Sequence, residues 1–433
     1  LYLPIMKYIL KILILIFFIS TSFSLHAQAP QWIVYNTGNS GLPGNSITDI
    51  VIDSNNIKWI GVGNSGLVKF DGNNWTVYDT LNSGIHSNNI FSVAIDKHNN
   101  IWAASVNSSP GGVSKFDGMK WTNFTPNNSN IPFGGILDMD FDSKENLWIS
   151  GFGLGKFDGT NWTYYKDTNS GLPSNSITCV KTDDTNIWIG TQSHRVVKFD
   201  GINWILYNSD NSGLPFNAIS WNCISIDSNN VKWIGTFGGG LAKFDNVNWT
   251  VYDPNNSGLP YWYIQSVFTQ SPQKIWIGVE DRGLSLFEYG STWNLFNISN
   301  SPLPSNFIRN SKVDRYGNLW IATGNGLVIY NENGVVNINN NFSVIPDAII
   351  LQQNYPNPFN PTTVINYELK TKVMVRLIVY DISGKEISTL VNEEQKAGNY
   401  IYTFNGAGLA SGIYFYVLQT NNFIKTKKMI LMK

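Results

Sequence analysis

Short apolar runs separated by clusters of Gly, Asn, Asp and Ser dominate the chain. Four such runs in succession are SITDIVID, IKWIGV, GLVKFD and NWTVYD. Runs of this kind, bounded by turn-forming residues and without a 3.6-residue apolar period, predict β-strands. The middle runs are almost continuously apolar, which is typical of strands covered by sheets on both faces. The pattern predicts an all-β protein.

Two series of tryptophans recur in phase and divide the chain into units. The first is Trp32, Trp75, Trp121, Trp162, Trp204, Trp249 and Trp293, and the second is Trp59, Trp102, Trp148, Trp188, Trp233, Trp276 and Trp320. Members of the first series are 41 to 46 residues apart. A four-strand unit of this length is a propeller blade. We therefore expect a seven-bladed β-propeller over residues 30–342.

The motif NSGLP, or a variant of it, follows each tryptophan of the first series. Its Gly and Pro suit the crossover from one blade to the next, and its Leu suits a gap between blades. Two segments compete to be the last strand of the seventh blade, WIVY and GVVNIN, and we expect Trp32–Tyr35 to fill this place. The recurring aspartates before the second tryptophan series are predicted hairpin residues, namely Asp53, Asp96, Asp142, Asp227 and Asp314.

Both ends of the chain differ from the repeat. Residues 1–29, with Met6 as an alternative start, combine a basic segment, an apolar run and small residues, as in a signal peptide. The apolar run is too short to span a bilayer, so no transmembrane anchor is expected. At the other end, Pro356, Pro358 and Pro361 predict a linker over 343–361. Alternating strands over 362–433 then predict a small Ig-like β-sandwich.

The repeat WIGTFGGGLAKFDNVNWTVY resembles the two-component regulator propeller repeat. That family includes periplasmic sensor regions of hybrid histidine kinases that respond to polysaccharides. The resemblance covers the propeller but no kinase or DNA-binding part. It therefore implies the fold and leaves the sensing role open.

The C-terminal segments NYPNPFNPTT, VYDISGKEI, AGNY, LASGIYFYVL and KTKKMILMK resemble the sorting domain of type IX secretion substrates. The resemblance implies the type IX machinery and its sortase as partners, in a Bacteroidetes-like bacterium. The protein would then be released or attached to surface lipopolysaccharide. The sorting-signal residues it implies are Gly384, Gly398, Gly412, Lys427 and Lys428. The alternative is an ordinary adhesive sandwich.

Charge and candidate chemistry narrow the function classes. With a formal charge of -1 and no basic stripe, no nucleic-acid partner is expected. His86, His98 and His194 do not form a metal-binding spacing, and no catalytic motif occurs. We expect no catalytic residues, metal or cofactor. Cys179 and Cys223 occupy equivalent points of adjacent units, too far apart for a disulfide, so two free thiols are predicted.

Departures from the repeat mark the candidate ligand site. In a propeller the loops from strand four to strand one and from strand two to strand three share one face. The candidate residues in and after these loops are His194, Arg195, Phe216, Trp221, Tyr261, Trp262, Tyr263, Glu280, Asp281 and Arg282. Aromatic rings beside charged groups suit sugars. Alternatively, the aromatics pack between blades, and Glu280, Asp281 and Arg282 pair with one another.

These features predict a non-enzymatic, monomeric propeller, secreted or attached to the cell surface, that binds a glycan or a protein on one face. One alternative is a lyase or hydrolase acting on a polysaccharide or small lactone, since virginiamycin-inactivating lyases also have seven blades. The other is a structural surface component.

Overall fold

The computed structural model describes residues 31–106, 111–132, 135–183, 185–192, 195–215, 218–335, 350–351, 353–354, 356–369, 372–395, 398–421 and 423–433. Two compact units account for this part of the chain, one within Gln31–Ser343 and one within Val344–Lys433. The predicted signal peptide and the GVVNIN residues from 336 onward lie outside the described residues. Over the described ranges, no helix is long and apolar enough to cross a membrane.

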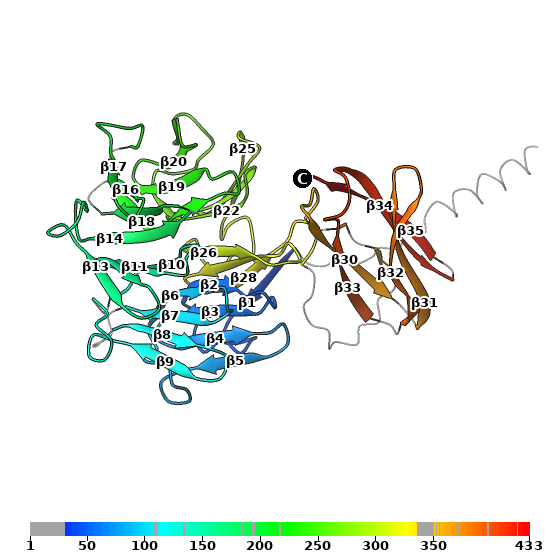
Figure 1. Ribbon diagram of the computed structural model, residues 1–433, viewed down its shortest axis with the longest axis horizontal. Helices are drawn as coiled ribbons and strands as arrows, with labels where there is room; N and C mark the ends of the chain where they lie inside the picture. The colour runs from blue at the N-terminus through cyan, green and yellow to red at the C-terminus, as the bar shows by residue number, and fades with distance from the viewer. Residues whose placement is uncertain are drawn as a thin grey trace, which may run out of the picture. The chain divides into compact units, whose positions relative to one another are not determined.

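The first unit is a seven-bladed propeller, as predicted (Figure 1). Between residues 31 and 335 the described strands form seven four-stranded antiparallel sheets. The first strands of neighbouring sheets contact one another around a closed ring, from β2 through β26 and back to β2. The strands that follow β1 are, blade by blade, β2 (Ile47–Ile52), β3 (Lys58–Val62), β4 (Gly66–Phe70), β5 (Trp75–Tyr78); β6 (Ile90–Ile95), β7 (Ile101–Ser105), β8 (Val113–Phe116), β9 (Trp121–Phe124); β10 (Asp138–Phe141), β11 (Leu147–Gly151), β12 (Gly153–Phe157), β13 (Trp162–Tyr165); β14 (Ile177–Thr182), β15 (Ile187–Thr191), β16 (Arg195–Phe199), β17 (Trp204–Tyr207); β18 (Ala218–Ile226), β19 (Lys232–Phe237), β20 (Leu241–Phe244), β21 (Trp249–Tyr252); β22 (Ile264–Ser271), β23 (Lys274–Val279), β24 (Gly283–Glu288), β25 (Thr292–Phe296); β26 (Ile308–Val313), β27 (Leu319–Thr323), β28 (Gly326–Tyr330).

The ring is closed by the N-terminal strand. β1 (Trp32–Tyr35) pairs antiparallel with β28, with Trp32 opposite Tyr330 and Tyr35 opposite Leu327. The rings of Trp32 and Tyr330 lie 4.4 Å apart. Trp32–Tyr35 therefore supplies the fourth strand of the seventh blade, as expected.

The NSGLP motif joins successive blades. A Cβ added to Gly171 would come within 2.5 Å of the Cβ of Trp204 in the next blade, so only glycine permits this approach. The leucine after it, Leu172, is 4% exposed and packs into the core. Ser170 Oγ donates to the Lys166 carbonyl at 2.7 Å and fixes the turn. The motif is thus structural, because each of these residues holds one blade against the next.

The hairpin aspartates bind the tryptophan that follows them. Asp142 Oδ1 accepts the backbone N–H of Asn146 at 2.9 Å, which closes the turn between β10 and β11. Its other oxygen accepts the indole N–H of Trp148 at 2.9 Å. The same carboxylate–indole bond recurs at Asp53, Asp96, Asp227 and Asp314. These carboxylates are hairpin residues, as predicted, and they also satisfy the only polar atom of a buried ring.

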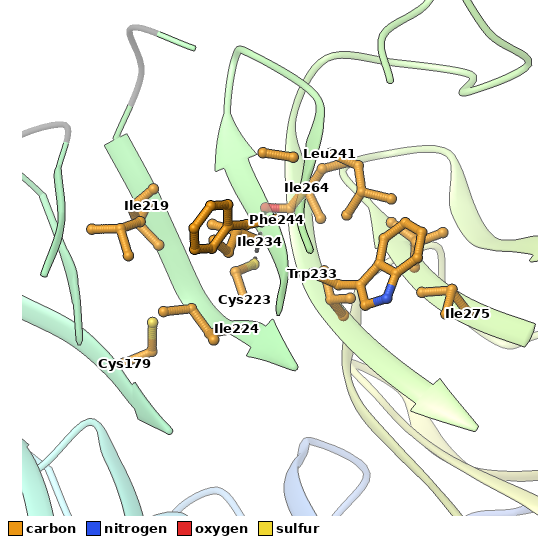
Figure 2. Packing of buried hydrophobic residues seen from close by; sticks show 14 of the residues in the cluster. Cys179, Ile219, Cys223, Ile224, Trp233, Ile234, Leu241, Phe244, Ile264 and Ile275 are labelled. Carbon is orange, nitrogen blue, oxygen red and sulfur yellow. Dashed lines mark hydrogen bonds between the residues drawn. The ribbon is translucent and has the colours of Figure 1, made fainter. Parts of the chain in front are cut away.

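The two cysteines are free and buried, as predicted. Cys179 belongs to β14 and Cys223 to β18, on first strands of adjacent blades (Figure 2). The Cys223 thiol donates to the Ile264 carbonyl of the following blade at 3.5 Å. Burial raises the pKa of Cys179 to about 12.

The C-terminal unit is a sandwich of two antiparallel sheets, as predicted. One contains β29 (Ile350–Leu351), β30 (Thr362–Leu369) and β33 (Gly398–Asn405). The other contains β32 (Glu386–Gln395), β31 (Val373–Asp381), β34 (Gly412–Thr420) and β35 (Phe423–Leu431). Their inner faces share one hydrophobic core.

The segment expected as a linker belongs partly to this sandwich. β29 pairs with β30, and Phe359 is 1% exposed and forms a bridge to Leu431. The expectation of a linker extending to residue 361 was therefore wrong, because its apolar residues complete the core of the sandwich. Proline is disfavoured within strands, so Pro356, Pro358 and Pro361 predicted a boundary between domains.

The sorting-signal positions lie on turns and strand ends. Gly384 has φ +84° in the turn between β31 and β32, a conformation that favours glycine. Gly398 and Gly412 begin β33 and β34. Lys427 and Lys428 pair with Tyr416 and Phe415 in the sheet. The structure gives these positions a place in the sandwich, and their role in sorting remains an implication of the resemblance.

Candidate functional site

The propeller has two distinct faces because the strands of each blade are antiparallel. The connections from strand two to three and from strand four to the next strand one lie on one face, here called the loop face. The hairpins from strand one to two and from three to four lie on the other, here called the hairpin face. Most sequence-predicted ligand residues belong to the loop face.

An aromatic row crosses the loop face between blades five and six. The rings of Phe237 and Tyr263 are 4.5 Å apart, and those of Tyr263 and Tyr261 are 5.1 Å apart. The Arg282 guanidinium stands 4.9 Å from the Tyr261 ring centre. Phe237 is 46% exposed although it is a large apolar residue. We call Phe237, Tyr263, Tyr261 and Arg282 the aromatic row. In this row three aromatic rings in contact with one another end at a cationic side chain.

Backbone hydrogen bonds hold the row in place. The Trp262 carbonyl accepts the N–H of Gly240 at 2.9 Å and that of Gly238 at 3.3 Å. The Tyr263 carbonyl accepts the N–H of Glu280 at 3.0 Å, and Tyr263 forms a β-bridge with Phe237. Both glycines have positive φ, which lets the loop turn beneath the rings. Adjacent blades therefore fix the row through main-chain contacts.

The charged neighbours do not pair with one another. Among the described ion pairs none joins Glu280, Asp281 and Arg282. Partial burial and the nearby Asp281 raise the pKa of Glu280. Arg282 instead lies over Tyr261. The structure brings together three of the predicted residues, Tyr261, Tyr263 and Arg282.

The other predicted residues are not part of this row. Arg195 begins β16, with its carbonyl accepting the Thr191 hydroxyl at 3.1 Å, in a blade that does not adjoin blade six. Trp221 lies within β18, where the pairing with β19 shifts register. His194 and Phe216 lie outside the described residues. Trp262 contributes its backbone carbonyl, which accepts the N–H groups that hold the loop beneath the row.

Sequence reasoning missed Phe237. In this loop, blades four and six depart from Gly, Ser and Asn with charged residues, whereas GTFGGG of blade five departs with an aromatic one. Phe152 occupies the same place in blade three, is 68% exposed and bridges to Ser176 rather than to a tyrosine. The two positions differ in their exposure and in the residue that each faces across the loop.

A second feature lies in the channel between the first strands, where a cavity of about 320 Å3 is lined by six polar residues and several apolar ones. The polar residues are Asp49, Asp138, Asp140, Lys181, Asn310 and Lys312. Lys181 Nζ lies 3.5 Å from Asp138 Oδ1. Burial raises the pKa of Asp138 to about 6, although Lys181 lowers it. Burial alone would lower the pKa of Lys181, but Asp138, Asp140 and Asp49 raise it overall.

The sequence contained a signal for this cavity. Its charged residues occupy positions four and two before the hairpin Asp or Gln that follows each first strand, where the uncharged residues are Ser, Cys, Val, Ala, Phe and Asn. These charges lie inside the first strands of their blades, among residues that are mostly buried. The sequence of a single strand does not show which of its faces lines the channel, so these charges did not predict a site.

Comparison with known proteins supports both halves of the sequence interpretation. Residues 353–432 match the family described as secretion system C-terminal sorting domain. Residues 171–193 and 302–325 match the family described as two component regulator propeller. No curated protein matches the sequence.

Solved structures show the same fold at low identity. The extracellular domain of a putative hybrid two-component system from B. thetaiotaomicron is 17% identical, with a TM-score of 0.59, over 93% of this chain and 57% of that one. PorZ, a surface component of the type IX secretion system of Porphyromonas gingivalis, is 18% identical, with a TM-score of 0.57, over 92% and 61%. A streptogramin B lyase is 12% identical, with a TM-score of 0.56, over 69% and 97%.

The chain therefore spans about three-fifths of the first two structures, and these identities show the fold alone. The sorting domain supports type IX export to the cell surface or beyond it. The protein thus carries two-component regulator propeller repeats followed by a secretion system C-terminal sorting domain.

Proposed function

We propose that this protein is an exported, non-enzymatic propeller that binds a glycan on its loop face, at the aromatic row. The sorting domain supports the exported location, where extracellular and surface polysaccharides are available. The binding site is proposed from the geometry of the row.

The observation that carries the proposal is the continuous contact from Phe237 through Tyr263 and Tyr261 to Arg282. Sugar rings present apolar C–H faces and hydroxyl edges, so they match aromatic faces flanked by hydrogen-bond donors. Phe237 offers an exposed ring, and Arg282 offers N–H donors that no described ion pair occupies. Since main-chain bonds already fix the row, little ordering is needed on binding.

The test is a glycan array with the full chain, followed by titration of the best ligand against variants. We expect Phe237→Ala and Arg282→Met each to weaken binding about tenfold, corresponding to about 1.4 kcal/mol. The matched control is Phe152→Ala, which removes an exposed phenylalanine from the equivalent loop of blade three and should leave binding unchanged.

Three results would overturn the proposal: no glycan bound, binding indifferent to both variants, or an equal loss in the control. Capture of a protein partner that depends on Phe237 and Arg282 would assign the row to protein recognition instead.

A further inference from the structure

The channel cavity is a separate place from the aromatic row. Its lining includes Ile52, Ile95 and Val313, the last residues of β2, β6 and β26. These residues directly precede the hairpins, so the cavity lies toward the hairpin face. Tyr263, by contrast, directly precedes β22 on the loop face.

All three carboxylates in the cavity accept a backbone N–H from the first strand of the next blade. Asp49 Oδ2 accepts the N–H of Val93 at 2.8 Å, and Asp138 Oδ2 accepts that of Val180 at 3.0 Å. Each bond joins the first strand of one blade to that of the next. Asp49 also accepts from the Asn310 amide. These carboxylates are therefore explained by blade packing.

The two lysines and the second oxygen of Asp140 are not satisfied in the same way. Lys312 Nζ makes no ion pair or hydrogen bond with any described residue, and it stands 5.4 Å from the centre of the Phe268 ring. Asp140 Oδ2 accepts the backbone N–H of Thr182 at 2.8 Å and the Thr182 hydroxyl at 3.2 Å, so Asp140 Oδ1 remains available. Lys181 has a single ion pair, with Asp138. Burial and the nearby Lys181 lower the pKa of Lys312, and the attraction of Asp49, Asp140 and Asp138 offsets this only in part, so the ammonium is incompletely compensated.

We propose that the channel cavity binds a small carboxylate with a hydroxyl or ammonium group beside it. The carboxylate lies between Lys312 and Lys181, the neighbouring donor bonds to Oδ1 of Asp140, and Phe268 covers the apolar part of the ligand. A volume of about 320 Å3 accommodates a ligand of monosaccharide or amino-acid size. This site is independent of the glycan site proposed above.

The two sources of such a ligand are a sugar acid and an amino acid, so D-glucuronate and L-glutamate are the probes. Calorimetric titration of the full chain carrying Phe237→Ala, which disrupts the proposed glycan site, should show binding of at least one of them, and D-glucose, which lacks the carboxylate, should not bind. Lys312→Met should weaken binding at least tenfold, since the side-chain length remains and only the charge is lost. Asp140→Asn should weaken it less, because one oxygen remains as an acceptor.

The matched control is Lys243→Met, which removes a lysine 5.4 Å from the Trp233 ring and outside the cavity. It should leave binding unchanged. Lys312→Met should also keep or raise the melting temperature, because it removes an unpaired ammonium, and this separates lost binding from lost folding. The aromatic-row variant Phe237→Ala should bind the probes normally.

The proposal is overturned if neither probe binds more tightly than about 10 mM. It is also overturned if glucose binds as well as glucuronate, or if Lys312→Met binds as the parent does. Failure of either site leaves the test of the other intact, since Phe237 does not line the cavity.

Discussion

The hairpins of the propeller and its central channel both contain carboxylates, yet they use them differently. Each hairpin aspartate, such as Asp142, binds its own turn and the indole of the next tryptophan. In the channel, carboxylates occur in blades one and three, lysines in blades four and seven, and uncharged residues elsewhere. A polar residue that recurs from blade to blade meets a structural requirement that the blades have in common. A polar residue found in only some blades calls for a different explanation.

The largest expected effect comes from breaking a hairpin aspartate that also pairs across blades. Asp314 accepts the Trp320 indole at 2.9 Å and lies 3.3 Å from Lys58 of the first blade, with both charged side chains fully buried. Asp314→Ala should cost about 3–5 kcal/mol, because it leaves Lys58 without a counter-charge. Urea unfolding of the full chain measures the loss.

Tryptophan fluorescence isolates the propeller in that experiment, since all 16 tryptophans lie between Trp32 and Trp320. The control is Asp117→Ala, in an exposed hairpin between strands three and four, which should change the midpoint far less. An equal shift of the urea midpoint in Asp314→Ala and Asp117→Ala would show that burial does not decide how much a hairpin aspartate stabilises the propeller.

Next in size is the effect of an added methyl group in the NSGLP motif. Gly171→Ala places a Cβ 2.5 Å from that of Trp204, so we expect a loss of about 1–3 kcal/mol in propeller stability. Gly135→Ala is the control, because a Cβ there meets nothing within 4 Å. The same urea midpoint measures both, and a neutral Gly171→Ala would contradict the packing role of the motif.

The channel should show an effect of similar size that depends on pH and that the hairpins lack. Because the pKa of Asp138 is raised to about 6, the folded protein holds this proton more tightly than the unfolded chain. The stabilisation is present below about pH 4 and is lost as pH rises through about 6. Its full size is on the order of 3 kcal/mol.

Asp138→Asn should therefore flatten the decline in propeller stability between about pH 4 and pH 7. In Asp142→Asn the decline should persist, since hydrogen bonds from Trp148 and Asn146 outweigh burial and lower the pKa of Asp142. Stability curves measured by fluorescence at each pH decide this. Parallel curves for the parent and Asp138→Asn would show that the buried Asp138 carboxyl does not cause the decline.

The smallest effect concerns the two thiols, which occupy the same strand position as the channel carboxylates. Both are buried, and burial raises the pKa of Cys179 to about 12, so alkylation of the native chain should be very slow. After unfolding without reductant, mass spectrometry should show two added groups. A single adduct, or none, would contradict the free thiols.

The blade number, the closing strand and the roles of NSGLP and the hairpin aspartates followed from the sequence, because they depend on spacing and turn chemistry that repeat along the chain. The candidate site followed only in part. Tyr261, Tyr263 and Arg282 lie in one loop-face cluster as their loops implied, but Phe237 joins them from another blade. Arg195 lies in blade four, which does not adjoin blade six, despite its similar loop.

The tertiary structure alone decided which departures from the repeat come together. The aromatic row joins two blades and the channel cavity six, so their residues are separated by tens to hundreds of positions along the chain. Local periodicity sets the form of each strand but does not reveal which side chain faces the channel. That choice depends on the register and packing of neighbouring sheets, which exist only once the ring has closed.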